Sequence, residues 1–351
     1  MSSEPDSPTS SWHAFLAGRG GRVAHGRVAD FGALAQELLA ARDGTIVCDL
    51  SHNALLEVAG DDATAFLHSQ FTNDVQALPE GAAQWSGWCS PKGRLLATFL
   101  LVKRPGGYLL MLPAQIAPAI AKRLSMFVLR SKAKIGDASS RFTRIGLAGR
   151  KAQVIVAREW GYAPDPLRTV DSGGDLCVAL DAERFVILAR PESAGRIFDA
   201  IAANATPAGT DAWEWTSIRA GIPTIVAATQ EAFVPQMANF DLVGGVSFKK
   251  GCYPGQEIVA RTQYRGTLKR RMALGHVGEG VAPAPGQAVY SKAFGDQAAG
   301  EIVNVAPAPG GGSDLLVVAQ IDSLRVRDLH LDAPQGTPIE ILGHPEIAPT
   351  P

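Results

Sequence analysis

The chain changes its pattern near residue 266, and this change limits the folds open to it. Before that point, apolar residues at helical spacing predict helices at 31–42, 63–70, 116–127, 193–203, 211–219 and 256–261. These alternate irregularly with strands predicted at 45–50, 54–58, 94–103, 107–112, 144–147, 153–156 and 185–188. Beyond it, Gly and Pro separate short β runs at 272–277, 288–291, 300–305, 315–321 and 339–341. Because no regular βαβ order is present, the pattern predicts an α+β fold with a small C-terminal β-barrel or β-sandwich.

Length and charge restrict the class of protein. The 351 residues predict two or three domains, and 46% hydrophobic with 19% charged residues is typical of a globular chain. A formal net charge of −1 gives no overall attraction to nucleic acid. Residues 1–29 are rich in Ser, Pro, Gly and Arg, which predicts a flexible tail. The first residues, MSSEPDSPTSSWHAF, lack a basic stretch followed by an apolar one, so they do not indicate a secretory signal. No apolar run approaches the ~20 residues of a membrane helix, so we expect a cytoplasmic protein without a membrane partner.

The cysteines are few and far apart, at Cys48, Cys89, Cys177 and Cys252. They form no CxxC pair, so the spacing predicts neither a zinc site nor a disulfide framework. The first three are expected to be buried free thiols. Isolated histidines such as His52, His68 and His276 have no second ligand at helical spacing. We therefore expect them at the surface or satisfied in the core, and we predict no metal site.

The segment with the most reactive side chains is VSFKKGCYPGQE, residues 246–257. Gly251, Pro254 and Gly255 predict a tight, irregular backbone that holds Cys252 at a fixed point. The adjacent Lys249 and Lys250 favour a thiolate. The alternative is a solvated loop that merely opens the helix at 256–261.

This segment resembles the signature of the YgfZ family, K-G-C-[YF]-x-G-Q-E. The run at 58–74, VAGDDATAFLHSQFTND, resembles the family segment G-x-D-A-x-x-F-L-Q-x-Q-x-T-x-D. CSPKGR at 89–94 resembles its C-x-x-K-G-[RK] turn, and AGIP at 220–223 with FVPQ at 233–236 resembles A-G-x-P…F-[IV]-P-Q. The four ordered motifs cover residues 45 to 275 or thereabouts.

The resemblance implies a three-lobed fold like that of the aminomethyltransferase of glycine cleavage, with a central channel for tetrahydrofolate. The implied division is a domain of 30–60 and 145–265, an inserted domain at 61–144, and a β-barrel at 266–346. It also implies a folate-binding protein that supports assembly, maintenance or repair of iron–sulfur proteins. Its implied clients include enzymes that modify transfer RNA.

The resemblance also implies roles for individual residues. Cys252 is the expected nucleophile or transient ligand, and Lys250 is expected to tune it. The expected folate contacts are Trp213, Gln70, Asn73, Lys92, Arg94, Tyr253, Gln256, Glu257 and Arg261. Trp213 and Trp215 cannot share a helix face, so we expect at least one of them to be partly exposed.

Two departures bear on the chemistry. The transferases carry paired aspartates after the glycine turn, whereas this chain reads GRLLAT at 93–98. Without that carboxylate no group is evident to assist proton transfer at folate. Asn53 also stands where relatives place an aromatic residue. The alternatives are a folate-dependent aminomethyltransferase or one-carbon transferase, and a folate sensor without chemistry.

Overall fold

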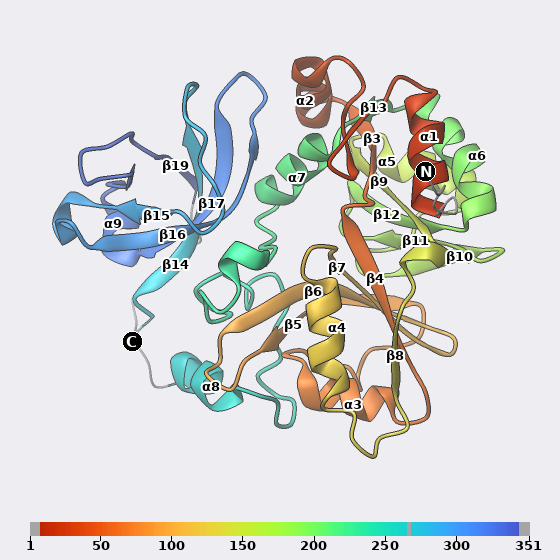
Figure 1. Cartoon of the computed structure of the whole chain (residues 1–351), viewed down its shortest axis with the longest axis horizontal. Coiled ribbons are helices and arrows are strands. Elements are labelled where there is room, and N and C mark those ends of the chain that lie inside the picture. The colour runs from red at the N-terminus through yellow and green to blue at the C-terminus, as the bar shows by residue number, and fades with distance from the viewer. Residues whose placement is uncertain (1–7, 265–267, 344–351) are drawn as a thin grey trace, which may run out of the picture. The chain divides into compact units, whose positions relative to one another are not determined.

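The computed structural model describes residues 8–264 and 268–343. Its contacts divide the chain into two compact units. The first unit comprises residues 1–63, 78–83 and 101–216, and the second comprises 64–77, 84–100 and 217–351. Helices and sheets mix along the chain, which confirms the predicted α+β class (Figure 1). The three-domain division suggested by the sequence stays a prediction.

The first unit is organised around a six-stranded sheet in the order β10-β11-β12-β9-β3-β13. Its pairs are antiparallel except the parallel pair of β13 with β3. The strands span Thr169–Ser172 (β10), Asp175–Ala179 (β11), Arg184–Ala189 (β12), Thr143–Gly149 (β9), Thr45–Asp49 (β3) and Thr206–Ala208 (β13). The associated helices are α2 (Leu34–Asp43), α5 (Ala152–Trp160), α6 (Pro191–Ala202) and α7 (Thr210–Arg219).

Strand β9 shows how the two faces of this sheet are used. Ile145 and Leu147 point to one face and join a core that includes residues of α5 and α6. Gly146 points to the other face, where an added Cβ would lie 2.6 Å from the Trp213 ring of α7. Because successive side chains of a strand alternate between faces, α7 covers the face opposite to α5 and α6.

The N-terminal segment differs from the predicted flexible tail of residues 1–29. Residues 1–7 lie outside the described chain, but α1 spans Pro8–Ala17, and β1 (Arg22–Ala24) pairs with β2 (Arg27–Asp30). Trp12 and Leu16 are buried, and α1 packs against α6 (Figure 1). Their i, i+4 spacing is the apolar period of a helix. The Ser and Pro content of the segment obscured it.

The strand predicted near 153–156 is wrong, because these residues lie inside α5. The β-branched residues there favour strands in isolation. The buried positions of α5 are Ala152, Ile155, Val156 and Trp160, a helical spacing set by packing on the sheet. Tertiary burial therefore outweighs local propensity here.

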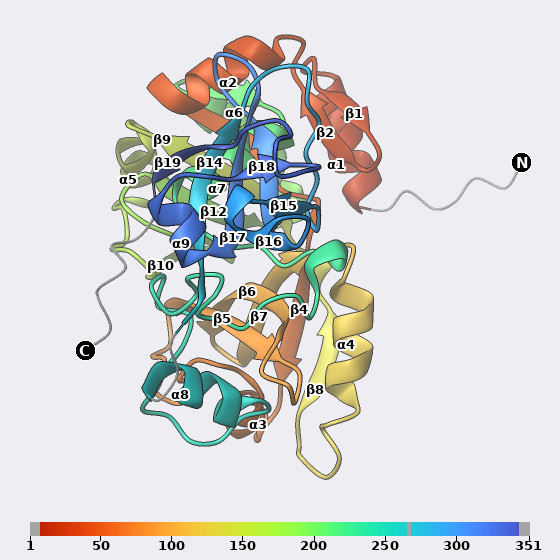
Figure 2. The ribbon, with the colours of Figure 1, turned by 90° about the vertical axis from the view of Figure 1, so that its left-hand side faces the viewer.

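A five-stranded sheet has the order β5-β6-β7-β4-β8, and residues of β5 and β6 are divided between the two units. Its strands span Ala82–Cys89 (β5), Leu95–Arg104 (β6), Gly107–Pro113 (β7), Asn53–Ala59 (β4) and Lys134–Asp137 (β8). Helix α3 spans Ala63–Gln70, and α4 spans Ala117–Ser125. Helix α4 packs against β4 and β8 within the first unit (Figure 2).

The predicted C-terminal β domain is a curled six-stranded antiparallel sheet in the order β18-β15-β16-β17-β14-β19. Its strands span Arg270–Val277 (β14), Ala288–Tyr290 (β15), Ala298–Pro307 (β16), Ser313–Gln320 (β17), His330–Leu331 (β18) and Glu340–Gly343 (β19). Helix α8 (Gln256–Tyr264) precedes it, and α9 is Ile321–Arg325. Short 3₁₀ turns lie at Ser139–Arg141, Ala227–Thr229 and Lys292–Phe294.

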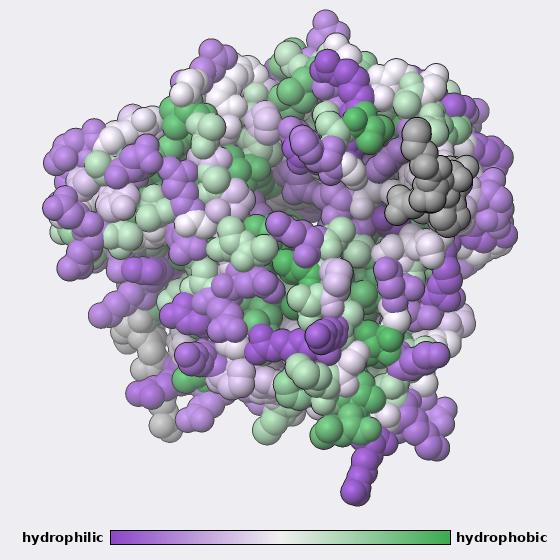
Figure 3. All heavy atoms as spheres, viewed as in Figure 1, coloured by the Kyte–Doolittle hydropathy of each residue, from purple (hydrophilic) through white to green (hydrophobic). Residues whose placement is uncertain are grey.

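The face shown in Figure 3 intersperses hydrophilic and hydrophobic side chains. Within residues 8–264 and 268–343, no helix combines the length and apolarity that crossing a membrane requires.

Candidate functional site

Cys252 differs from the other three cysteines in its exposure. It is exposed on the loop that leads into α8, whereas Cys48, Cys89 and Cys177 are buried as the sequence predicts. Burial raises the pKa of each of these three thiols well above its ordinary value. Cys252 is therefore the cysteine that a partner can approach.

The described part of the chain contains no group of three His, Cys, Asp or Glu side chains placed to hold a metal ion.

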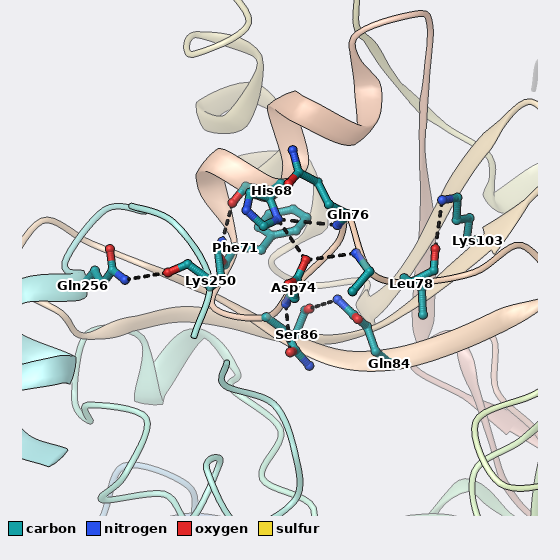
Figure 4. Close-up of polar contacts among 12 residues, drawn as sticks. His68, Phe71, Asp74, Gln76, Leu78, Gln84, Ser86, Lys103, Lys250 and Gln256 are labelled. Atoms are coloured by element: carbon teal, nitrogen blue, oxygen red, sulfur yellow. Dashed lines mark hydrogen bonds and ion pairs between the residues drawn. The ribbon is translucent and has the colours of Figure 1, made fainter. Parts of the chain in front are cut away.

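Lys250 attaches the loop that carries Cys252, residues 246–255 (the cysteine loop), to the end of α3. Its Nζ donates hydrogen bonds to the carbonyl oxygens of His68 and Phe71, the latter at 2.5 Å (Figure 4). The last carbonyls of a helix lack partners within the helix, and a cation there also complements the helix dipole. Lys250 is only 7% exposed, and burial lowers the pKa of its amine to about 8. Besides any effect on Cys252, this lysine is thus an anchor.

Two glycines lock the cysteine loop to the CSPKGR turn. Gly255 and Gly93 have φ of +80° and +69°, a region that favours glycine. A Cβ on Gly255 would lie 2.5 Å from the Ser90 carbonyl oxygen and 2.6 Å from the Gly93 nitrogen. A Cβ on Gly93 would lie 2.8 Å from the Ile258 Cβ of α8. Two motifs far apart in the sequence therefore meet through their glycine backbones.

His68 lies beside this loop, a role that the sequence reasoning missed. Its Nδ1 is 3.2 Å from Asp74 Oδ1, and the Gln76 backbone N–H donates to Nδ1 at 3.4 Å (Figure 4). A Cβ on Gly251 would lie 3.8 Å from Nε2, so this edge of the ring faces the residue before Cys252. Burial and the Lys250 charge lower the pKa of His68, which keeps the imidazole neutral at pH 7. The sequence contained one sign of this role, because His68 stands where the family segment F-L-Q-x-Q has its first Gln.

Three other residues predicted to contact folate differ in the hydrogen bonds that their side chains form within the protein. Asn73 Nδ2 donates to the carbonyls of Trp85 and Gly244 at 2.8 and 2.7 Å. Arg94 Nη1 donates to the Ala232 carbonyl at 2.5 Å. Both side chains therefore brace neighbouring backbone. The Gln70 Oε1, in contrast, is buried and has no hydrogen-bond partner among the described residues.

The remaining residues predicted in the second unit lie in the loop, in α8 or in the CSPKGR turn. Tyr253 is buried, with Lys250 Nζ 4.8 Å from its ring centroid. Gln256 Nε2 donates to the Lys250 carbonyl at 3.3 Å. The side chains of Lys92, Glu257 and Arg261 are exposed. The structure thus gathers Cys252, Lys250 and the CSPKGR turn around the start of α8.

Trp213 belongs to the first unit and is buried against Gly146. Trp215 is buried too, at 7% exposed against 4% for Trp213, so the expectation that one of them is partly exposed is wrong. Both faces of α7 are covered, which a helical periodicity argument cannot reveal. A contact of Trp213 with a ligand stays a prediction.

Thr98 occupies the region where the transferases carry an acid, and its hydroxyl is already engaged. It donates to the Pro223 carbonyl at 2.9 Å and accepts from the Ile225 N–H at 3.0 Å. The side chain therefore holds the segment after AGIP in place. Neither it nor the buried Ala97 supplies a carboxylate.

Replacing Lys250 by Met should lower the free energy of unfolding by ~2 kcal/mol, because two helix-end carbonyls lose their donor. The matched change Lys249→Met, at an exposed position, should cost less than ~0.5 kcal/mol. Urea denaturation of both variants measures this. Equal effects would contradict the anchoring role.

The stability that Lys250 confers should also depend on pH. The pKa of Lys250 is about 8 in the folded chain against an ordinary 10.5. Between these values the unfolded chain binds more protons, so stability conferred by Lys250 rises with pH. The gap between wild type and Lys250→Met should therefore widen from pH 8 to 10.5, and a gap that narrows would contradict this account.

Comparison with known proteins finds a matching family model and similar sequences. Residues 15–162 match the model of the GCVT N-terminal domain. The tRNA-modifying protein YgfZ of Cronobacter sakazakii is 31% identical over 257 residues, which cover 72% of this chain and 77% of that protein. The protein of the same name from Klebsiella pneumoniae is 31% identical over 222 residues, covering 62% of this chain and 68% of the relative.

The solved structure of glycine cleavage system aminomethyltransferase T from Bartonella henselae is similar over 96% of both chains. Its TM-score is 0.78 at 15% sequence identity. This likeness confirms the aminomethyltransferase-like fold that the sequence motifs predict.

Proposed function

The chain belongs to the YgfZ family, and from this membership we propose that it binds a folate and supports iron–sulfur proteins. The proposed clients are cluster-bearing enzymes, including those that modify tRNA, whose clusters it helps to assemble, maintain or repair. The name of the relatives, tRNA-modifying protein, supports the tRNA connection. The observation that carries the proposal is Cys252, exposed on a loop fixed by Lys250 and by the Gly93–Gly255 contact.

The residues of the second unit fit a tetrahydrofolate. A pterin carries several N–H donors, and the buried Gln70 Oε1 is an acceptor without a partner among the described residues. An unsatisfied buried acceptor costs ~1–3 kcal/mol, which a ligand donor would relieve. The exposed Lys92 and Arg261 suit the carboxylates of the glutamate tail. When bound, tetrahydrofolate supplies nitrogen atoms that can carry one-carbon groups.

Cys252 is proposed to contact the client's iron, which is the substrate here. Thiolate sulfur is the form that binds metal and acts as a nucleophile. The rigid loop offers this sulfur at the surface, while the three buried thiols are withheld from any partner. Such an arrangement suits brief contact with another protein.

The alternative is a folate-dependent aminomethyl or one-carbon transfer. That chemistry needs a group that moves a proton at the folate nitrogen. The hydroxyl of Thr98 is committed to the backbone of Pro223 and Ile225, and no carboxylate replaces it there. This favours binding and client support over transfer.

Calorimetric titration tests the ligand. Tetrahydrofolate should bind, and Gln70→Leu should weaken binding by about tenfold, because the pterin loses an acceptor. The unliganded variant should be at least as stable as wild type, because the acceptor that it loses has no partner among the described residues. The exposed Gln76 provides the control, and Gln76→Leu should leave the affinity unchanged. Absence of binding to wild type would contradict the proposal, whereas unchanged affinity in Gln70→Leu would contradict only the placement.

A further inference from the structure

A cleft in the first unit is lined by side chains that the proposed function does not use. Its volume is about 760 Å³, within the ~300–1,000 Å³ typical of sites for small ligands. Most of the lining comes from the end of β6 and the turn after it, the residues just before β9, the end of α5 and the β10–β11 hairpin. The cationic lining residues are Lys103, Arg104, Arg141 and Arg190.

Two of these arginines form cation–π contacts with the same aromatic ring. The guanidinium carbons of Arg104 and Arg141 lie 5.6 and 5.9 Å from the centroid of Phe142. Arg141 also pairs with Glu57 at 2.6 Å. Arg104 forms no ion pair with a carboxylate of the described residues. A guanidinium held by a ring keeps its N–H donors available, and these donors match phosphate oxygens in geometry.

An aromatic side chain is exposed in the same cleft. Tyr162 is 57% exposed and follows Gly161, whose φ of +85° ends α5 and turns the chain. Trp160 lines the same cleft and is buried, and its Nε1 donates to the Asp175 carbonyl at 3.1 Å. An exposed tyrosine beside arginines is a surface on which a nucleobase can stack.

Carboxylates on the lining narrow the class of ligand further. Glu80 and Asp171 are exposed and line the cleft. They would repel bare phosphate, but they accept hydrogen bonds from amino and hydroxyl groups. A nucleoside phosphate carries an anion for Arg104, a flat ring for Tyr162, and N–H and O–H donors for the carboxylates. We propose that this cleft binds a nucleoside phosphate, either free or as part of an RNA strand.

The test uses the full chain and four probes, measured by isothermal titration calorimetry. AMP represents a free nucleoside phosphate, and a single-stranded oligoadenylate represents an RNA strand. Adenosine and inorganic phosphate represent the two halves of AMP. AMP should bind more tightly than either part. Arg104→Ala and Tyr162→Ala should each weaken AMP by about tenfold. Arg158→Ala, at an exposed arginine of α5 outside the cleft, should change nothing.

The outcomes distinguish a free nucleotide from an RNA strand, and a nucleotide site from a folate site. Tighter binding of the oligoadenylate supports an RNA strand, and tighter binding of AMP supports a free nucleotide. The proposal is overturned if neither binds, if binding survives both variants, or if inorganic phosphate binds as well as AMP. It is also overturned if tetrahydrofolate competes with AMP, because the cleft would then be a folate site.

Discussion

Under limiting iodoacetamide at neutral pH, Cys252 should be alkylated at least about 100-fold faster than Cys48, Cys89 or Cys177. Only Cys252 is exposed, and burial raises the pKa of the other three thiols, so they hold little thiolate. They can react only when the structure opens locally. An opening free energy of ~3 kcal/mol alone slows such a thiol by more than about 100-fold. Mass mapping of labelled peptides gives the order directly.

The labelling experiment contains its own control. In urea all four thiols become accessible, and their rates should converge to within about tenfold. If Cys252 is the slowest thiol of the native protein, it is a packing residue. The role of the loop would then pass to Lys250, Gln256 and Glu257.

The sequence motifs predict which residues matter more reliably than what each does. Gly93 and Gly255 stand out as turn glycines, but their contact depends on two loops that meet only in the folded chain. Lys250 is expected to act on the thiol, and the fold buries its amine against the carbonyls of His68, in α3, and Phe71, just after it. Charge and spacing along the chain are visible in a sequence. Burial and hydrogen-bond partners depend on residues more than 150 positions away.

Helices and strands with a clean apolar period are predicted well, and the exceptions have physical causes. Helix α3 matches its predicted bounds, residues 63–70. Helix α1 was missed because only Trp12, Phe15 and Leu16 carry its period within a Ser- and Pro-rich segment. In α5 the β-branched residues favoured a strand until packing on the sheet decided otherwise.

If Cys252 carries the function, its loss should abolish complementation in living cells. Cells that lack the gene should be supplied with wild type, Cys252→Ala, or Cys177→Ala as a cysteine control. The measurement is the amount of tRNA modification made by iron–sulfur enzymes, by mass spectrometry, with protein levels matched. Wild type and Cys177→Ala should restore the modification, and Cys252→Ala should restore almost none. Full restoration by Cys252→Ala would contradict the account.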